Sequence, residues 1–296
     1  MKFTVPENVM FSQAVSNEID RLLAGLEVYE VASQEALNSN VFGRAFVSVA
    51  DAFTGVLQTF KTNVLKFPKG LKRSELREFI DSNMLKVKTV NGFTFDKCMK
   101  IQMVAPAGMA GSYVEASTSV LDVYNKLGAL NIARLADTTF TNIYKSLSRE
   151  DGNAGKIVNS AASMIDRTVK SAGPTITACQ KEFAGDKVAN FEFAKCFKTM
   201  EEFRMTQSSL LDMESRLQEV KELDTLVTHM EDTLKSICSI ITANEAVMSK
   251  PDVMALGNIA KGVALIFEAE SMAATRQLAL EHNLVLNINT LYNKVR

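Results

Sequence analysis

The chain has 296 residues, 47% of them hydrophobic, with 33 lysine and arginine residues against 34 aspartate and glutamate residues. A chain of this length and composition can bury a sizeable core, which excludes a mainly disordered protein. Its net charge of -1 lacks the global basic excess of a general nucleic-acid-binding protein, so an electrostatic partner must be recognised locally.

Only 5 prolines and 14 glycines interrupt the sequence, and both residues disfavour helix interiors, so long helices are favoured. We expect a mainly α protein, an elongated multi-helix bundle with long antiparallel helices and a small β-hairpin insert. Residues 1–67 form an N-terminal helical hairpin in this interpretation. Residues 68–111 hold a short helix, the β-hairpin and a small-residue loop, and residues 112–296 form a long-helix bundle that shares one core with the hairpin.

The first predicted helix covers residues 11–38, where apolar residues recur at helical spacing. A second helix follows a turn at residues 38–40 and ends near Pro68 and Gly70. Its apolar residues step four, three, four, three and four along the chain: Phe42, Phe46, Val49, Phe53, Val56 and Phe60. The two helices are expected to form an antiparallel pair.

The next segment carries the β-hairpin signal. A short helix is predicted in SELREFIDSN, after which LKVKTVNGFTF places Asn91 and Gly92 between β-favourable residues. This dipeptide is typical of a two-residue hairpin turn with positive φ at both positions. We expect MKIQMVAP to add a third extended segment, and the small residues of APAGMAGS (105–112) to form a loop.

Helical spacing resumes near Tyr113 and predicts one helix to about residue 147, with Gly128 as a weak point. The turn DGNAG follows, then a helix to about residue 170. Breaks are expected at Gly173-Pro174 and at Gly185-Asp186. A last helix is predicted from Asp252, after Pro251, to about residue 292.

The stretch LQEVKELDTLVTHMEDTLKSI (217–237) repeats apolar residues at three- and four-residue steps, typical of a helix packed in a seam. One four-residue step is missing between Val220 and Leu223, which is the pattern of a stammer in a coiled coil. Other helices of the chain offer apolar faces, so we favour a seam within one chain over a seam between copies. The residues predicted to be buried there are Leu217, Leu223, Val227, Met230 and Leu234.

No catalytic, cofactor or metal site is predicted. The four cysteines lie far apart without a CxxC pair, and the chain has only two histidines, so the sequence holds no zinc-ligand pattern. DGNAGKIV resembles a phosphate loop only superficially, because Ile157 follows Lys156 where serine or threonine is needed. No serine stands in a G-x-S-x-G elbow. We therefore expect a protein that is not an enzyme.

Two segments carry opposite local charge. The basic patch between residues 61 and 88 has eight cations: Lys61, Lys66, Lys69, Lys72, Arg73, Arg77, Lys86 and Lys88. With three acidic residues among them, the patch has a net charge of +5, whereas residues 212–232 have seven acidic and two basic residues, a net charge of -5. The basic patch could bind nucleic acid or an acidic protein surface, and the second is favoured because the chain itself offers one.

The segments KGLKRSELREFIDSNMLKVKTV and GFTFDKCMKIQMVAPAGMAGSYVEASTSVLDVYNKL, spanning Lys69 to Leu127, resemble the helical virion structural proteins of large tailed bacteriophages. The resemblance rests on a tryptophan-free composition rich in Asn, Thr, Phe and Met, and on a small-residue loop before a long helix. It implies a many-copy assembly protein that is made in the bacterial cytoplasm and built into a virion. It carries over no site residues.

The leading hypothesis is a non-enzymatic structural or assembly protein that binds copies of itself or neighbouring assembly proteins. A cytoplasmic adaptor that binds one partner helix in a groove remains an alternative. A third alternative is a membrane-active helical protein, although no run approaches the roughly 18 apolar residues of a spanning helix. No small-molecule substrate and no membrane partner are expected.

Overall fold

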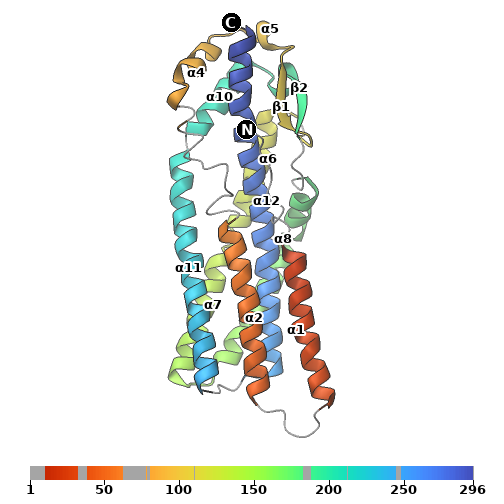
Figure 1. Ribbon diagram of the computed structural model, residues 1–296, viewed down its shortest axis with the longest axis vertical. Helices are drawn as coiled ribbons and strands as arrows, with labels where there is room; N and C mark the ends of the chain where they lie inside the picture. The colour runs from red at the N-terminus through yellow and green to blue at the C-terminus, as the bar shows by residue number, and fades with distance from the viewer. Residues whose placement is uncertain are drawn as a thin grey trace.

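The computed structural model describes residues 11–32, 39–62, 78, 81–109, 111–182, 188–211, 213–244 and 248–295, which form an elongated, mainly α-helical rod (Figure 1). The elements are α1 (Ser12–Ala32), α2 (Ser39–Phe60), α4 (Met84–Asn91), α5 (Phe95–Cys98), β1 (Gln102–Pro106), α6 (Tyr113–Gly128), α7 (Ile132–Arg149), α8 (Ala154–Glu182), β2 (Val188–Glu192), α9 (Phe193–Cys196), α10 (Met200–Leu211), α11 (Met213–Asn244) and α12 (Lys250–Val295). The expected mainly α architecture is confirmed.

Helix α12 is the axis of the rod. Its 46 residues extend about 69 Å at the rise of an α-helix, and in Figure 1 it runs from one end of the molecule to the other. It packs against α1, α2, α4, α6, α7, α8 and β1. Because neighbours surround it, nearly every side chain from Asp252 to Leu291 is buried, polar ones included. The buried apolar residues form a single core along this helix, and its members range in sequence from Phe11 to Leu291.

The lower half of the rod is a bundle in which α1, α2, α7 and α8 pack on α12, while α11 packs on α2 and α7 (Figure 1). Helices α1 and α2 form the expected antiparallel pair, although residues 33–38 lie outside the described part. The α2 stripe is buried as predicted from Phe46 to Phe60. At its end the ring of Phe60 stacks on Phe267 of α12, with 3.9 Å between ring centroids.

The upper end is built from α4, α5, the two strands, α9 and α10, gathered around the end of α12 (Figure 1). Its core is an aromatic cluster that links α6 to α9 and α10. Phe197 stacks on Tyr113 with centroids 5.1 Å apart and meets Phe203 edge-on at 5.1 Å. Phe193 packs against both Phe197 and Phe203.

The structure contains a small two-stranded sheet, but the sheet does not lie at the predicted residues. Asn91 is the last residue of α4, and Gly92 has φ −82°, so no hairpin turn forms there. The helix is stabilised by tertiary contacts: Val90 is fully buried, and Arg204 of α10 donates from Nε and Nη2 to the Asn91 carbonyl at 3.0 and 2.7 Å. A cation on the last carbonyls of a helix stabilises that end.

The observed sheet pairs β1 with β2 in antiparallel register, Gln102 opposite Glu192 and Pro106 opposite Val188. Strand β1 is the extended segment predicted in MKIQMVAP, whereas β2 was not predicted. The other edge of β1 is closed by a side chain of α12. Asn287 accepts a hydrogen bond from the Val104 N–H (2.7 Å) and donates one to the Val104 carbonyl (2.8 Å), as a neighbouring strand would.

We expect Asn287→Ala to lower the free energy of unfolding by about 1–3 kcal/mol, because the Val104 N–H would lose its acceptor in a partly buried position. The Val104 carbonyl would keep the hydrogen bond from the Tyr113 hydroxyl (3.1 Å). Chemical denaturation measures the change. Thr290→Ala, one turn further along α12, is the control, because its hydroxyl bonds only to Leu286 of the same helix. Similar losses in both variants would contradict the role given to Asn287.

Two helix boundaries also differ from expectation. Gly173-Pro174 does not break the chain, because α8 runs on to Glu182 with Pro174 inside it. Lys170, Ser171 and Pro174 are exposed, so water can hydrogen-bond the carbonyl that the proline leaves without a donor. Conversely, the helix predicted from residue 113 to 147 is two helices, with α6 ending at Gly128 and α7 beginning after Asn131. None of the described helices is long and apolar enough to span a membrane.

Candidate functional site

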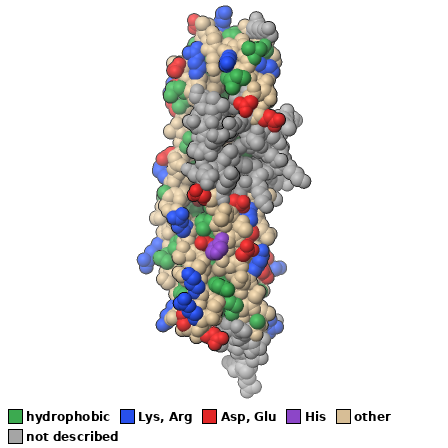
Figure 2. All heavy atoms as spheres, turned by 90° about the vertical axis from the view of Figure 1, so that its left-hand side faces the viewer, with side chains coloured by type: hydrophobic (Ala, Val, Ile, Leu, Met, Phe, Trp, Pro, Cys, Tyr) green, Lys and Arg blue, Asp and Glu red, His purple; other side chains and the backbone are tan. Residues whose placement is uncertain are grey.

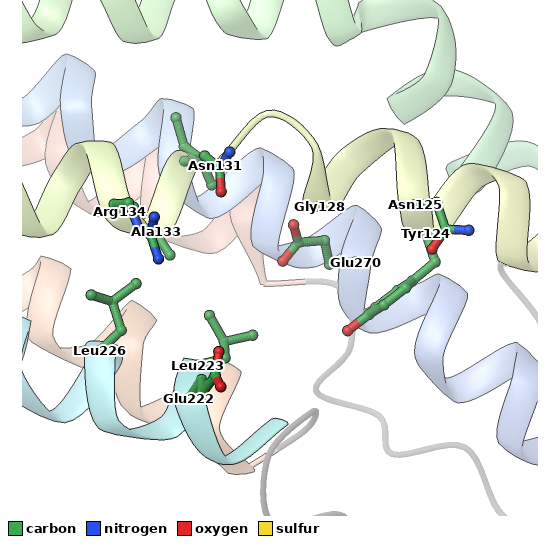
Figure 3. Close-up of a pocket in the computed structure, with 11 residues that line it drawn as sticks. Tyr124, Asn125, Gly128, Asn131, Ala133, Arg134, Glu222, Leu223, Leu226 and Glu270 are labelled. Atoms are coloured by element: carbon green, nitrogen blue, oxygen red, sulfur yellow. The ribbon is translucent and has the colours of Figure 1, made fainter. Parts of the chain in front are cut away.

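A cavity of about 400 Å³ opens where α6 ends and α7 begins. Four helices line it: α6 and α7 on either side of their junction, α11 opposite them, and α12 at the base (Figure 3). The lining residues are Tyr124, Asn125, Gly128, Asn131, Ile132, Ala133, Arg134, Glu222, Leu223, Leu226 and Glu270. We call it the Glu270 pocket. Its volume lies within the range of small-molecule sites.

Glu270 is the buried ionisable group of this pocket. Its side chain points from α12 into the gap between the end of α6 and the start of α7 (Figure 3). Glu270 is only 7% exposed, and among the described residues its carboxyl group has no hydrogen-bond or ion-pair partner. Burial raises the pKa of this carboxyl to about 8, because a charged group loses its hydration there.

Neighbouring polar groups on α12 are paired with surrounding segments. Glu268, two residues earlier, accepts a hydrogen bond from the Ser12 N–H (2.6 Å) at the start of α1. Gln277 accepts one from the Ser117 hydroxyl of α6 (3.1 Å), and Asn287 holds β1. These contacts fasten α1, α6 and the sheet to the axis. Glu270 faces a cavity instead.

The start of α7 presents unpaired donors to the same pocket. Asn131, at the N-cap, has a left-handed backbone (φ 50°, ψ 34°), and its side chain does not cap the helix. The first helical hydrogen bond runs from the Leu135 N–H to the Asn131 carbonyl. Within the described residues, the N–H groups of Ile132, Ala133 and Arg134 therefore have no acceptor. Such a helix end carries partial positive charge and attracts anions.

The pocket also has an apolar wall. Leu223 and Leu226 of α11 lie opposite Asn131 and Glu270 in Figure 3. The guanidinium of Arg134 and the exposed carboxylate of Glu222 stand at the rim. The pocket therefore combines one buried acid, one set of free N–H donors and an aliphatic surface.

The described part of the chain offers few other groups that could bind a metal ion or act as a nucleophile. No group of three or more His, Cys, Asp or Glu side chains there could hold a metal ion. All four cysteines are free. Burial raises the pKa of the Cys196 and Cys238 thiols to about 11, so at neutral pH they are poor nucleophiles.

The structure separates the predicted basic patch. Lys61 lies against α11, where its amino group donates to the Thr228 hydroxyl (2.8 Å) and lies 3.4 Å from Glu231 and 3.8 Å from Asp224. The contact predicted from opposite charges thus exists within one chain, at this lysine. The remaining members are on α4 or outside the described residues.

On α4, Lys86 donates to Asn289 of α12 (3.2 Å) and lies 5.9 Å from the centre of the Tyr292 ring. Lys88 is exposed. The other five cations, Lys66, Lys69, Lys72, Arg73 and Arg77, lie outside the described residues. Of the three described cations, two make contacts within the chain, and only Lys88 is exposed to a partner.

The predicted seam is present within the chain, where α11 packs on α7 and α2. Val227 and Met230 are fully buried, and Leu234 is 1% exposed. Leu223 is partly buried and lines the Glu270 pocket, while the Leu217 side chain lies outside the described part. His229, beside the seam, contacts Asp137 of α7 at 2.5 Å.

Comparison with known proteins gives no relative. No protein-family model matches the chain, and neither a curated protein nor a solved structure is significantly similar to it.

Proposed function

We propose that the protein is a non-enzymatic structural component of a larger assembly, which binds copies of itself or neighbouring assembly proteins through the upper end of the rod. The observation that carries this proposal is that four of the seven large exposed apolar side chains in the described part of the chain belong to this end. An elongated protein with a partner-binding surface at one end is better suited to be a structural component of an assembly than an enzyme.

Four large apolar side chains are exposed on the elements of this end: Leu85 of α4 (73%), Met99 after α5 (36%), Val188 of β2 (54%) and Met205 of α10 (64%). Figure 2 shows apolar side chains among lysines and arginines on one face of this end. Exposed apolar side chains at one end of a molecule can mark protein contacts when a partner covers them together.

The outer edge of β2 offers a second contact at the same end. The Phe193 N–H bonds to the Ile101 carbonyl (2.8 Å), and antiparallel alternation then directs the backbone groups of Ala189 and Phe191 toward β1. Those of Val188 and Asn190 point away, and no described residue pairs with them. An open strand edge of this kind can accept a strand from another chain.

The more specific proposal of a tailed-phage virion component is supported by the resemblance of residues 69–127 to the helical virion structural proteins of large tailed bacteriophages. In that setting the protein is made in the bacterial cytoplasm and then incorporated into the particle. A second candidate, an adaptor for a single partner protein, would use the same end but would not self-associate.

Sedimentation velocity over a wide concentration range tests the self-association. We expect larger species to appear as concentration rises, and Leu85→Glu with Met205→Glu to shift the association to at least tenfold higher concentration. Met164→Glu is the matched control, because Met164 is also exposed (43%) but lies on α8. A monomer at every concentration would contradict self-association and favour the adaptor. Equal effects of both sets of changes would contradict the choice of the upper end.

A further inference from the structure

We propose that the Glu270 pocket binds a free aliphatic α-amino acid, with the ammonium group on Glu270, the carboxylate on the N–H groups at the start of α7, and the side chain against Leu223 and Leu226. This inference does not depend on the assembly role.

The pocket brings together an acid and a set of N–H donors that each lack a partner among the described residues. Glu270 is more than nine-tenths buried and is aimed into the pocket without a partner among the described residues (Figure 3). A buried carboxylate is stabilised by a cation or a hydrogen-bond donor. The N–H groups of Ile132, Ala133 and Arg134 require an acceptor, and a carboxylate satisfies a helix N-terminus well. One ligand that carries an ammonium and a carboxylate group on the same carbon atom answers both requirements.

A ligand with a single charged group fits the Glu270 pocket poorly. An amine alone would meet Glu270 but would face the positive end of α7 and the Arg134 guanidinium. A carboxylate alone would satisfy α7 but would bring no cation to pair with the ionised form of Glu270. An amino acid within a peptide lacks one or both charges, so the free zwitterion fits best.

The pocket also offers a surface for the side chain of the ligand. Leu223 and Leu226 form an aliphatic wall on the side of the pocket away from the α6–α7 junction (Figure 3). An aliphatic side chain such as that of leucine or methionine would be buried against this wall and would gain hydrophobic stabilisation. The cavity of about 400 Å³ leaves room for such a residue.

Binding should also depend on pH. Pairing with an ammonium needs the ionised form of Glu270, and burial holds its pKa at about 8. The titratable and charged groups that face it are Tyr124 of α6, Arg134 of α7 and Glu222 of α11. Affinity should therefore increase from pH 6 to pH 8, by up to about tenfold per pH unit.

Calorimetric titration of the full-length protein with L-leucine tests the proposal, with leucinamide and 4-methylpentanoate as probes that lack the carboxylate and the ammonium. We expect leucine to bind at least tenfold more tightly than either probe. Glu270→Gln keeps the shape of the side chain and should weaken leucine binding at least tenfold, removing its pH dependence. Glu222→Gln, at the exposed rim, is the control and should change affinity less than threefold.

Each alternative result would overturn the proposal. These results are no binding of leucine at millimolar concentration, equal binding of leucine and either probe, and unchanged binding by Glu270→Gln. Unfolding curves of both variants, measured alongside, show whether a lost signal comes from lost folding.

Discussion

Replacing Phe267 by alanine should lower the free energy of unfolding by about 3–5 kcal/mol, the usual effect of removing a buried aromatic ring. Phe267 lies midway along α12, is fully buried, and stacks on Phe60 with ring centroids 3.9 Å apart. The change would leave a cavity where α2 meets the axis of the rod. Urea denaturation followed by circular dichroism measures the loss.

Met254→Ala provides the comparison on the same helix. Met254 is 43% exposed, so its truncation should change stability by no more than about 0.5 kcal/mol. If Phe267→Ala were equally mild, α2 could not be packed on α12 as described.

The stability of the protein should decrease as pH rises from about 4.5 to about 8 through the contribution of Glu270. Its pKa in the folded state is raised to about 8, whereas an exposed glutamate titrates near 4.3. Between these values the folded state holds a proton that the unfolded state has released. Each pH unit in this window therefore removes up to about 1.4 kcal/mol, and the contribution of Glu270 is fully present only below pH 4.5.

Glu270→Gln isolates this contribution from other titrating groups. The variant should lose the decrease that Glu270 causes, so that its stability relative to the wild-type protein rises steadily from pH 5 to pH 8. Denaturation midpoints across this range give the difference. A constant difference between the two proteins would show that the Glu270 carboxyl keeps its ordinary pKa and is not held in a dry site.

Helices with a strong periodic stripe could be predicted from the sequence. The α2 stripe from Phe46 to Phe60 is buried as its spacing indicated, and the last helix predicted from Asp252 is present as α12. The spacing could not reveal that α12 is enclosed on all sides, since this depends on how many neighbours pack around it. Pro174 was misread for a related reason: the burial of the rest of α8 against its neighbours outweighs the hydrogen bond that the proline removes, and the freed carbonyl is on an exposed face.

The β structure and the pocket depended on contacts between residues far apart in the sequence. Asn91-Gly92 has the local preference of a hairpin turn, but Arg204 and the burial of Val90 stabilise a helix there. Strand β2 is five residues long and pairs with a segment far upstream, so no local signal indicated it. The only sequence hint of the Glu270 pocket was an acidic residue within an apolar part of α12.

Cross-linking between copies tests the central claim, contact through the upper end, most directly. Two preparations with different isotopes are mixed, allowed to associate and treated with an amine-reactive cross-linker, so that mixed-isotope peptides report only contacts between chains. We expect such cross-links at exposed lysines of the upper end, among them Lys88, Lys97, Lys100 and Lys195, and few at Lys145 and Lys156, near the opposite end. Cross-links between copies confined to Lys145 and Lys156, or absent altogether, would contradict it.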